Sequence, residues 1–73
     1  MTKFTLGIMA AGDDEPVRRF AFTAGDSAAA QFQANQAYEK CRRDYPDATE
    51  LHLADARGQS WNRTITGEWT SAQ

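Results

Sequence analysis

The sequence predicts an α+β fold in which one helix covers one face of a four-stranded antiparallel sheet, in the order β-β-α-β-β. Three observations predict it: two amino-terminal segments alternate apolar and polar residues, a central segment is rich in helix formers, and two further alternating segments follow. The 73 residues have room for one domain. No linker divides the chain, so we expect that domain to span residues 1–73.

The first two strands are expected at residues 3–9 and 17–23, because their apolar side chains recur with the period of two that a half-buried strand requires. Residues 10–16 between them contain Gly, Pro and three acidic side chains, which is typical of a hairpin loop longer than two residues. The side chains expected on the core face are Phe4, Leu6, Ile8, Phe20 and Phe22.

The helix is expected at residues 28–43, which lack Gly and Pro. Asp26 or Ser27 is expected to cap its first turn, and Pro46 disfavours helix in the residue before it. One stripe of the helix carries mostly small residues, which would let it lie close to a sheet with large core side chains. The residues in this stripe are Ala30, Ala34, Ala37, Tyr38, Cys41 and Tyr45.

The last two strands are expected at residues 49–55 and 60–66, with residues 56–59 as the turn between them. Their expected core side chains are Leu51, Leu53, Trp61 and Ile65. Gly67 ends the fourth strand, and residues 68–70 either prolong it or pack back on the domain. The opposite sheet face is expected to be a polar platform without stacking aromatics, made by Thr5, Arg19, Ala21, Glu50, His52, Asn62 and Thr64.

Composition limits the location and the cofactors. A single cysteine, Cys41, cannot form an internal disulfide, so we expect a reducing, cytoplasmic environment. We read Cys41 as a buried small side chain, with a reactive thiol as the alternative. Cys41 and His52 are too few ligands for structural zinc, so no metal or other cofactor is expected. The apolar run at residues 4–11 is too short for a secretion signal or a membrane span.

The motifs of common enzymes do not occur in the chain. A phosphate-binding loop, a dinucleotide fingerprint and a nucleophile elbow are all missing. His52 lies two residues from Glu50, a spacing that would let a general base be oriented by a carboxylate, but no nucleophile accompanies them. We therefore predict that the protein is not an enzyme.

Phe32 does not fit the helix pattern, because it lies opposite the buried stripe. It is either an exposed aromatic, a side chain covered by a nearby loop, or an anchor for a binding partner, since aromatic residues carry much of the energy at interface centres. A homodimer that buries Phe32 fits the same observation. Trp69 is the other large apolar side chain that the predicted core does not use.

The first hairpin carries charges of both signs. Asp13, Asp14 and Glu15 form an acidic tip, and Arg18 and Arg19 follow it. Such charges commonly solubilise a loop and protect a sheet edge. Alternatively, the acidic tip docks on a basic surface of a partner protein, with Phe32 and Trp69 as further contacts.

The charge balance bears on nucleic-acid binding. Eight Lys and Arg residues against ten Asp and Glu residues give a net charge of −2, whereas a nucleic-acid-binding domain is usually basic. We therefore disfavour direct binding to nucleic acid. The alternative function left open is a small accessory domain that contacts phosphates through Arg18 and Arg19 and through a second patch, Lys40, Arg42 and Arg43.

In its size, its Ala- and Gln-rich helix between two hairpins and its acidic tip at residues 13–15, the chain resembles the small anti-CRISPR inhibitors of bacteriophages. The resemblance covers the layout of the whole chain and assigns no residue a role. It implies a stoichiometric inhibitor in the cytoplasm of a bacterial host. Such an inhibitor would bind a Cas protein or surveillance complex and block access to DNA or to a nuclease.

Overall fold

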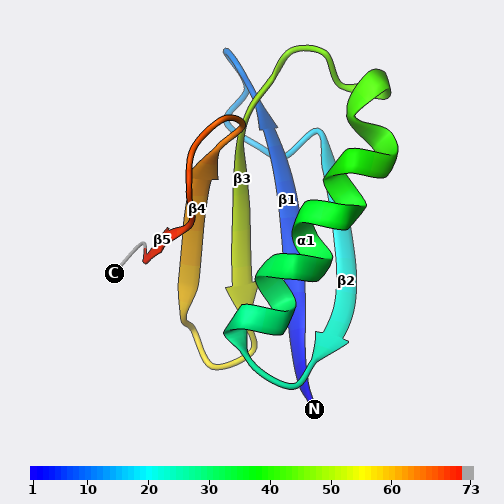
Figure 1. Ribbon diagram of the computed structural model, residues 1–73. Coiled ribbons are helices and arrows are strands. Elements are labelled where there is room, and N and C mark those ends of the chain that lie inside the picture. Colours follow the sequence, from blue (N-terminus) through cyan, green and yellow to red (C-terminus); the bar gives the residue numbers. More distant parts are fainter. Residues whose placement is uncertain (72–73) are drawn as a thin grey trace.

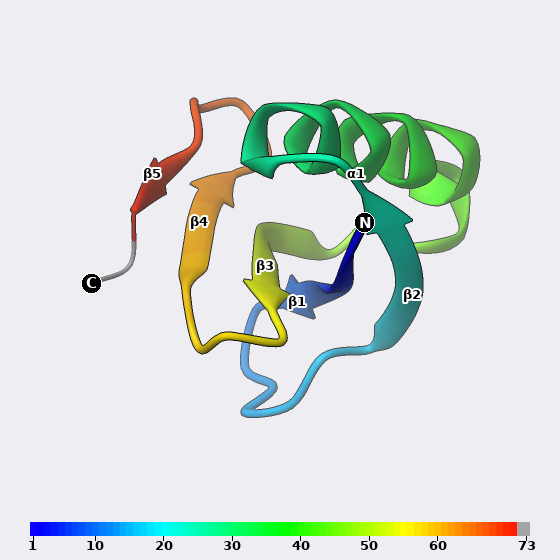
Figure 2. The same ribbon diagram turned by 90° about the horizontal axis from the view of Figure 1, so that it is seen from below.

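One antiparallel sheet and one long helix form two layers in the computed structural model, which describes residues 1–71 (Figures 1 and 2). The helix lies across a single face of the sheet. The elements are β1 (Thr2–Ala10), β2 (Arg18–Ala24), α1 (Ser27–Cys41), a 3₁₀ turn η1 (Arg42–Asp44), β3 (Ala48–Asp55), β4 (Ser60–Thr64) and β5 (Thr70–Ser71). The strand order is β2-β1-β3-β4-β5, so β1, β3 and β4 each have a neighbouring strand on both sides, and β2 and β5 are the edges.

The predicted α+β class is confirmed, but the prediction of four strands is wrong, because the described residues form five. β4 ends at Thr64 rather than Thr66, and the chain turns and returns antiparallel to β4 as β5. The register places Trp61 opposite Ser71 and Asn62 opposite Thr70. A strand of two residues has no period to detect, so alternation along the sequence does not reveal it.

The helix begins and ends for local reasons. Asp26 is the N-cap, and its carboxylate accepts a hydrogen bond of 2.8 Å from the backbone N–H of Ala29. The α-helix ends at Cys41, two residues before the predicted end, because the chain tightens into the 3₁₀ turn η1, after which the N–H of Tyr45 donates to the carbonyl of Arg42.

The core lies between α1 and the strands β1 and β3. Its fully enclosed large side chains are Leu6, Ile8, Leu51 and Leu53. From the helix, Ala30, Ala34 and Tyr38 are buried, as their spacing predicts, while Ala37 and Cys41 pack around them partly exposed. Tyr45, predicted in the same helix stripe, lies beyond the helix after η1 and packs against the core from there. Phe4 of β1 contacts aromatic rings from strands on both sides of it, since its ring centre lies 6.0 Å from that of Phe22 in β2 and 6.1 Å from that of Trp61 in β4. Small helix side chains thus face large sheet side chains, which lets the two layers lie close together, as the sequence predicts.

Candidate functional site

The outer face of α1 exposes the one large aromatic side chain that the core leaves out among the described residues. Phe32 is 62% exposed, which excludes the alternative that a loop covers it. It is two residues from both Ala30 and Ala34, which are fully buried, so the helical phase turns it away from the sheet. A shallow hollow of about 420 Å³ lies beside its ring, and the residues that line it are Phe32, Asn35, Gln36, Glu39 and Lys40.

Asn35 joins this helix face to the carboxyl-terminal part of the sheet. Its side-chain oxygen accepts a hydrogen bond of 3.1 Å from the indole N–H of Trp69 and one of 2.6 Å from the guanidinium of Arg63. Both partners can only donate, so Asn35 must present its oxygen rather than its NH₂ group to them. Asn35 therefore joins two residues that follow it in the sequence by 28 positions, Arg63, and by 34 positions, Trp69.

Arg63 holds the segment that carries Trp69. Besides its bond to Asn35, its guanidinium donates to the carbonyl of Ile65 at 2.7 Å and to that of Thr64 at 3.1 Å. Its charged carbon also lies 5.9 Å from the centre of the Trp69 ring, within the range of a cation–π contact. Trp69 is therefore partly buried against the core and fixed at one edge of the helix layer, rather than left free.

We call Phe32, Asn35, Gln36, Arg63 and Trp69 the aromatic surface. Of the residues predicted to contact a partner, it contains Phe32 and Trp69, which the structure brings to the same side of the molecule through Asn35. Sequence reasoning missed Asn35 and Arg63. A lone asparagine within a helix and a lone arginine within a strand carry no pattern, and only the tertiary fold brings them together.

The other predicted contacts lie elsewhere. The loop between β1 and β2 curls over the sheet face that the helix leaves uncovered (Figure 2). A Cβ on Gly7, which points to that face, would lie 3.0 Å from the ring of Pro16. Asp13, Asp14 and Glu15 are exposed and belong to this loop, which lies on the opposite side of the sheet from α1. The sheet face predicted to be an open platform is thus partly covered, and the predicted contacts form at least two separate surfaces.

The acidic tip meets other acidic residues at this end of the molecule. A small hollow of about 150 Å³ is lined by Asp13 together with Asp44 and Asp47 from the connection between α1 and β3. Val17 and Tyr45 give the hollow an apolar part. Asp44 and Asp47 follow Asp13 in the sequence by 31 and 34 positions, so the sequence did not reveal this grouping.

The basic side chains predicted to contact phosphate lie at several places in the fold. The guanidinium of Arg18 lies 5.0 Å from the ring centre of Phe20, on the helix side of the sheet, while Arg19 points to the other side. Arg42 forms an exposed ion pair of 3.4 Å with Glu39. Of the two basic patches predicted for phosphate contact, Arg18 and Arg19 therefore lie on opposite sheet faces, and the patch of Lys40, Arg42 and Arg43 is interrupted by the Glu39 carboxylate.

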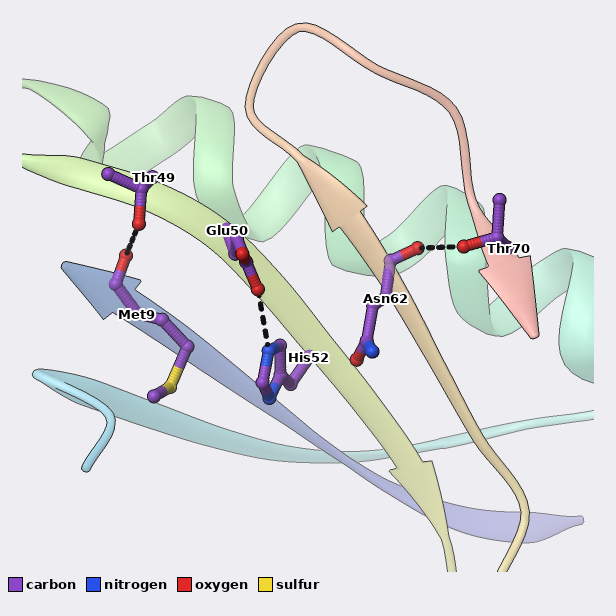
Figure 3. Close-up of polar contacts among 6 residues, drawn as sticks. All are labelled: Met9, Thr49, Glu50, His52, Asn62 and Thr70. Atoms are coloured by element: carbon purple, nitrogen blue, oxygen red, sulfur yellow. Dashed lines mark hydrogen bonds and ion pairs between the residues drawn. The ribbon is translucent and has the colours of Figure 1, made fainter. Parts of the chain in front are cut away.

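The sheet face opposite α1 carries the only histidine of the sequence (Figure 3). The Nε2 atom of His52 lies 3.0 Å from the carboxylate of Glu50, and both side chains are nearly half exposed. The hydroxyl of Thr70 donates to the carbonyl of Asn62 at 3.3 Å nearby. The only cysteine packs on the helix side, so the sheet separates it from His52. The pair exists as its spacing suggested, but no thiol reaches it.

The thiol of Cys41 is held within the domain. It donates to the carbonyl of Ala37 at 3.3 Å and is partly buried. Burial, and then the negative charge of Asp44, raise the pKa of Cys41, and these effects exceed the opposing influence of Arg18. A raised pKa lowers the thiolate fraction at neutral pH, so the geometry favours a structural cysteine over a reactive one.

Comparison with known proteins found no family model, no curated protein and no solved structure that matches this chain. Among the described residues, no helix is both long and apolar enough to pass through a bilayer. Within residues 1–71, no three histidine, cysteine or acidic side chains gather closely enough to hold a metal ion.

Proposed function

We propose that this protein is a binding module without catalytic activity, and that its aromatic surface is the contact for a partner protein. The observation that carries the proposal is the exposure of Phe32, 62%, beside a hollow on the outer face of α1. Exposed phenylalanine gains nothing for folding, whereas burial of an aromatic ring at an interface contributes strongly to binding.

The neighbours of Phe32 support this assignment. Trp69 and Arg63 are residue types enriched in the energetic centres of interfaces. Both are held in place by Asn35, so little side-chain freedom remains to be lost when a partner binds. Asn35 lines the hollow with the exposed Phe32 and holds Trp69, so a partner that meets Phe32 there also meets fixed polar and aromatic groups.

A protein partner fits the charge distribution better than a nucleic acid. Arg42 is already paired with Glu39, and Asp44 follows at the same end of the helix. Binding to nucleic acid scales with the number of phosphates that basic side chains neutralise, and carboxylates next to them oppose it. The guanidinium of Arg63 in the aromatic surface is already occupied by three acceptors, and the hollow beside Phe32 is lined by one charge of each sign, Glu39 and Lys40.

The most specific form of the proposal is a stoichiometric inhibitor of the anti-CRISPR type. Its support is the size and layout of the chain and the acidic loop, in which Asp13, Asp14 and Glu15 are exposed. Such a loop suits a basic groove that otherwise holds nucleic acid, because complementary charge speeds association and fixes register. In this form, the loop is a second contact in addition to the aromatic surface, and the target is a Cas protein or surveillance complex.

The experiment is a comparison of affinity capture by three forms of the tagged protein. Wild type, Phe32→Ala and Arg57→Ala are exposed to the same cell extract, and retained proteins are quantified. Arg57 is the control because it is exposed in the turn between β3 and β4. We expect a protein that wild type and Arg57→Ala retain equally and Phe32→Ala retains at less than about a tenth of that level.

Each variant also needs its thermal midpoint measured. Because Phe32 contributes little to the core, Phe32→Ala should unfold at nearly the wild-type temperature. A large loss of stability would show that Phe32 belongs to the core, and equal retention by Phe32→Ala would exclude the aromatic surface as the contact. For the anti-CRISPR form, the purified protein should block DNA binding or cleavage by a Cas complex at equimolar amounts; no block would exclude that target.

A further inference from the structure

The two edges of the sheet differ in how they are protected. At one edge, the residues that the structure describes form a strand of only two residues, β5. At the other, β2 has seven residues, and its pairing with β1 runs from Arg18 to Ala24 without a register shift. A regular edge strand of this length, free of proline and bulges, is a template for pairing with another strand.

The side chains of β2 leave apolar surface uncovered at this edge. Phe20 and Phe22 are partly buried beneath α1 and join the edge of the core. On the other sheet face, Ala21 is exposed and small. A strand added beside β2 would cover the two aromatic rings on one face. On the other face it would meet the small side chain of Ala21 at the centre of the strand, with Arg19 and Thr23 on either side of it.

We propose that two copies of this chain associate through β2, paired antiparallel about Ala21, to form one continuous sheet. In this register Phe20 of each copy lies opposite Phe22 of the other, on the helix side. Aromatic residues directly opposite each other across antiparallel strands attract, and the arrangement repeats itself under the two-fold axis. The aromatic residues of β2 are therefore placed so that a second copy of the same strand matches them.

The charges select the same arrangement. Both positive charges of β2 lie at its beginning, in Arg18 and Arg19, and its other end, Thr23 and Ala24, is uncharged and leads into Asp26. Antiparallel pairing places the arginines of one copy beside the uncharged end and the acidic residue of the other. Parallel pairing would set four arginines side by side, and like charges directly opposite one another repel.

The tilt of α1 permits such pairing. The helix crosses the sheet obliquely, so its carboxyl-terminal end projects past β2 near the beginning of that strand, while its amino-terminal end lies over the middle of the sheet (Figure 1). In the two-fold dimer, the projecting end of each helix would lie over the carboxyl-terminal end of β2 in the other copy. The helix of that other copy leaves this end of its own β2 open. The exposed hydrogen bond of 3.2 Å from the Gln33 side chain to the carbonyl of Thr23 is the contact that a second strand would have to accommodate.

Ala21 provides a direct test, because in this register it faces itself across the axis. Ala21→Lys and Ala21→Glu each place two like charges together, and each variant should dimerise at least about fivefold more weakly than wild type in sedimentation equilibrium. An equimolar mixture of the two variants should restore the dimer as a mixed species. Thr5→Lys is the matched control, since Thr5 pairs with Ala21 on the same face but lies on β1, away from the edge.

Three results would overturn the proposal. Wild-type protein that remains monomeric up to millimolar concentration has no such interface. A dimer that Ala21→Lys and Thr5→Lys preserve equally does not use the β2 edge. A dimer that is abolished by Phe32→Ala but not by Ala21→Lys uses the aromatic surface instead. The spectrum of each variant by circular dichroism shows that the fold is kept, so loss of the dimer cannot be confused with unfolding.

Discussion

Replacing Asn35 by alanine should loosen the aromatic surface without disturbing the core. The substitution removes the acceptor shared by Trp69 and Arg63, at 3.1 Å and 2.6 Å. A neutral hydrogen bond contributes about 1 kcal/mol and one to a charged group about 1.5–3 kcal/mol. The better helix propensity of alanine offsets about 0.5 kcal/mol of the loss. We expect the free energy of unfolding to fall by about 2–3.5 kcal/mol, which lowers the Tm of a domain of this size by roughly 10–25 °C.

Two measurements check this prediction. Denaturant unfolding gives the change in free energy, and the NMR signal of the Trp69 indole N–H should shift and exchange faster with solvent. Gln36→Ala is the matched control, because Gln36 lies on the same helix face and is exposed. The reasoning is refuted if Asn35→Ala is as stable as Gln36→Ala and the indole signal stays unchanged, because Asn35 would then not hold the tryptophan.

Three further predictions concern the core, the loop and the thiol. Leu6→Ala should cost about 3 kcal/mol in denaturant unfolding, because Leu6 is fully buried. Gly7→Ala should move the β1–β2 loop, seen as NMR shifts at and around Pro16, whereas Gly25→Ala, with nothing within 4 Å of the new Cβ, should not. Since the pKa of Cys41 is raised, its alkylation rate should reach half-maximum at a higher pH than that of free cysteine; an equal or lower midpoint would contradict this.

The main elements follow from short-range patterns, which is why the sequence was sufficient to predict them. Alternation placed Leu6 and Leu53 on the core face, and the helical phase turned Phe32 outward. β5 was not predictable in the same way, because the chain return after Thr64 depends on the guanidinium of Arg63 and on pairing with β4. Those contacts are tertiary and have no periodic signature.

The candidate site was predictable only in part. Exposure of Phe32 follows from its neighbours along the helix, but its link to Trp69 requires Asn35, 34 positions before that residue. Gly7 within a strand pattern was a signal that something approaches the backbone closely, yet the sequence does not say that Pro16 does so. Likewise, the grouping of Asp13 with Asp44 and Asp47 depends on where two connections meet in space.

The central claim is that the aromatic surface binds a protein, and titration of the captured partner tests it most directly. The Kd of that partner is measured by calorimetry for wild type, Phe32→Ala and Arg57→Ala. We predict that Phe32→Ala raises the Kd by about thirtyfold, equivalent to about 2 kcal/mol, while Arg57→Ala leaves it unchanged. A Kd that is the same for Phe32→Ala and wild type would contradict the claim.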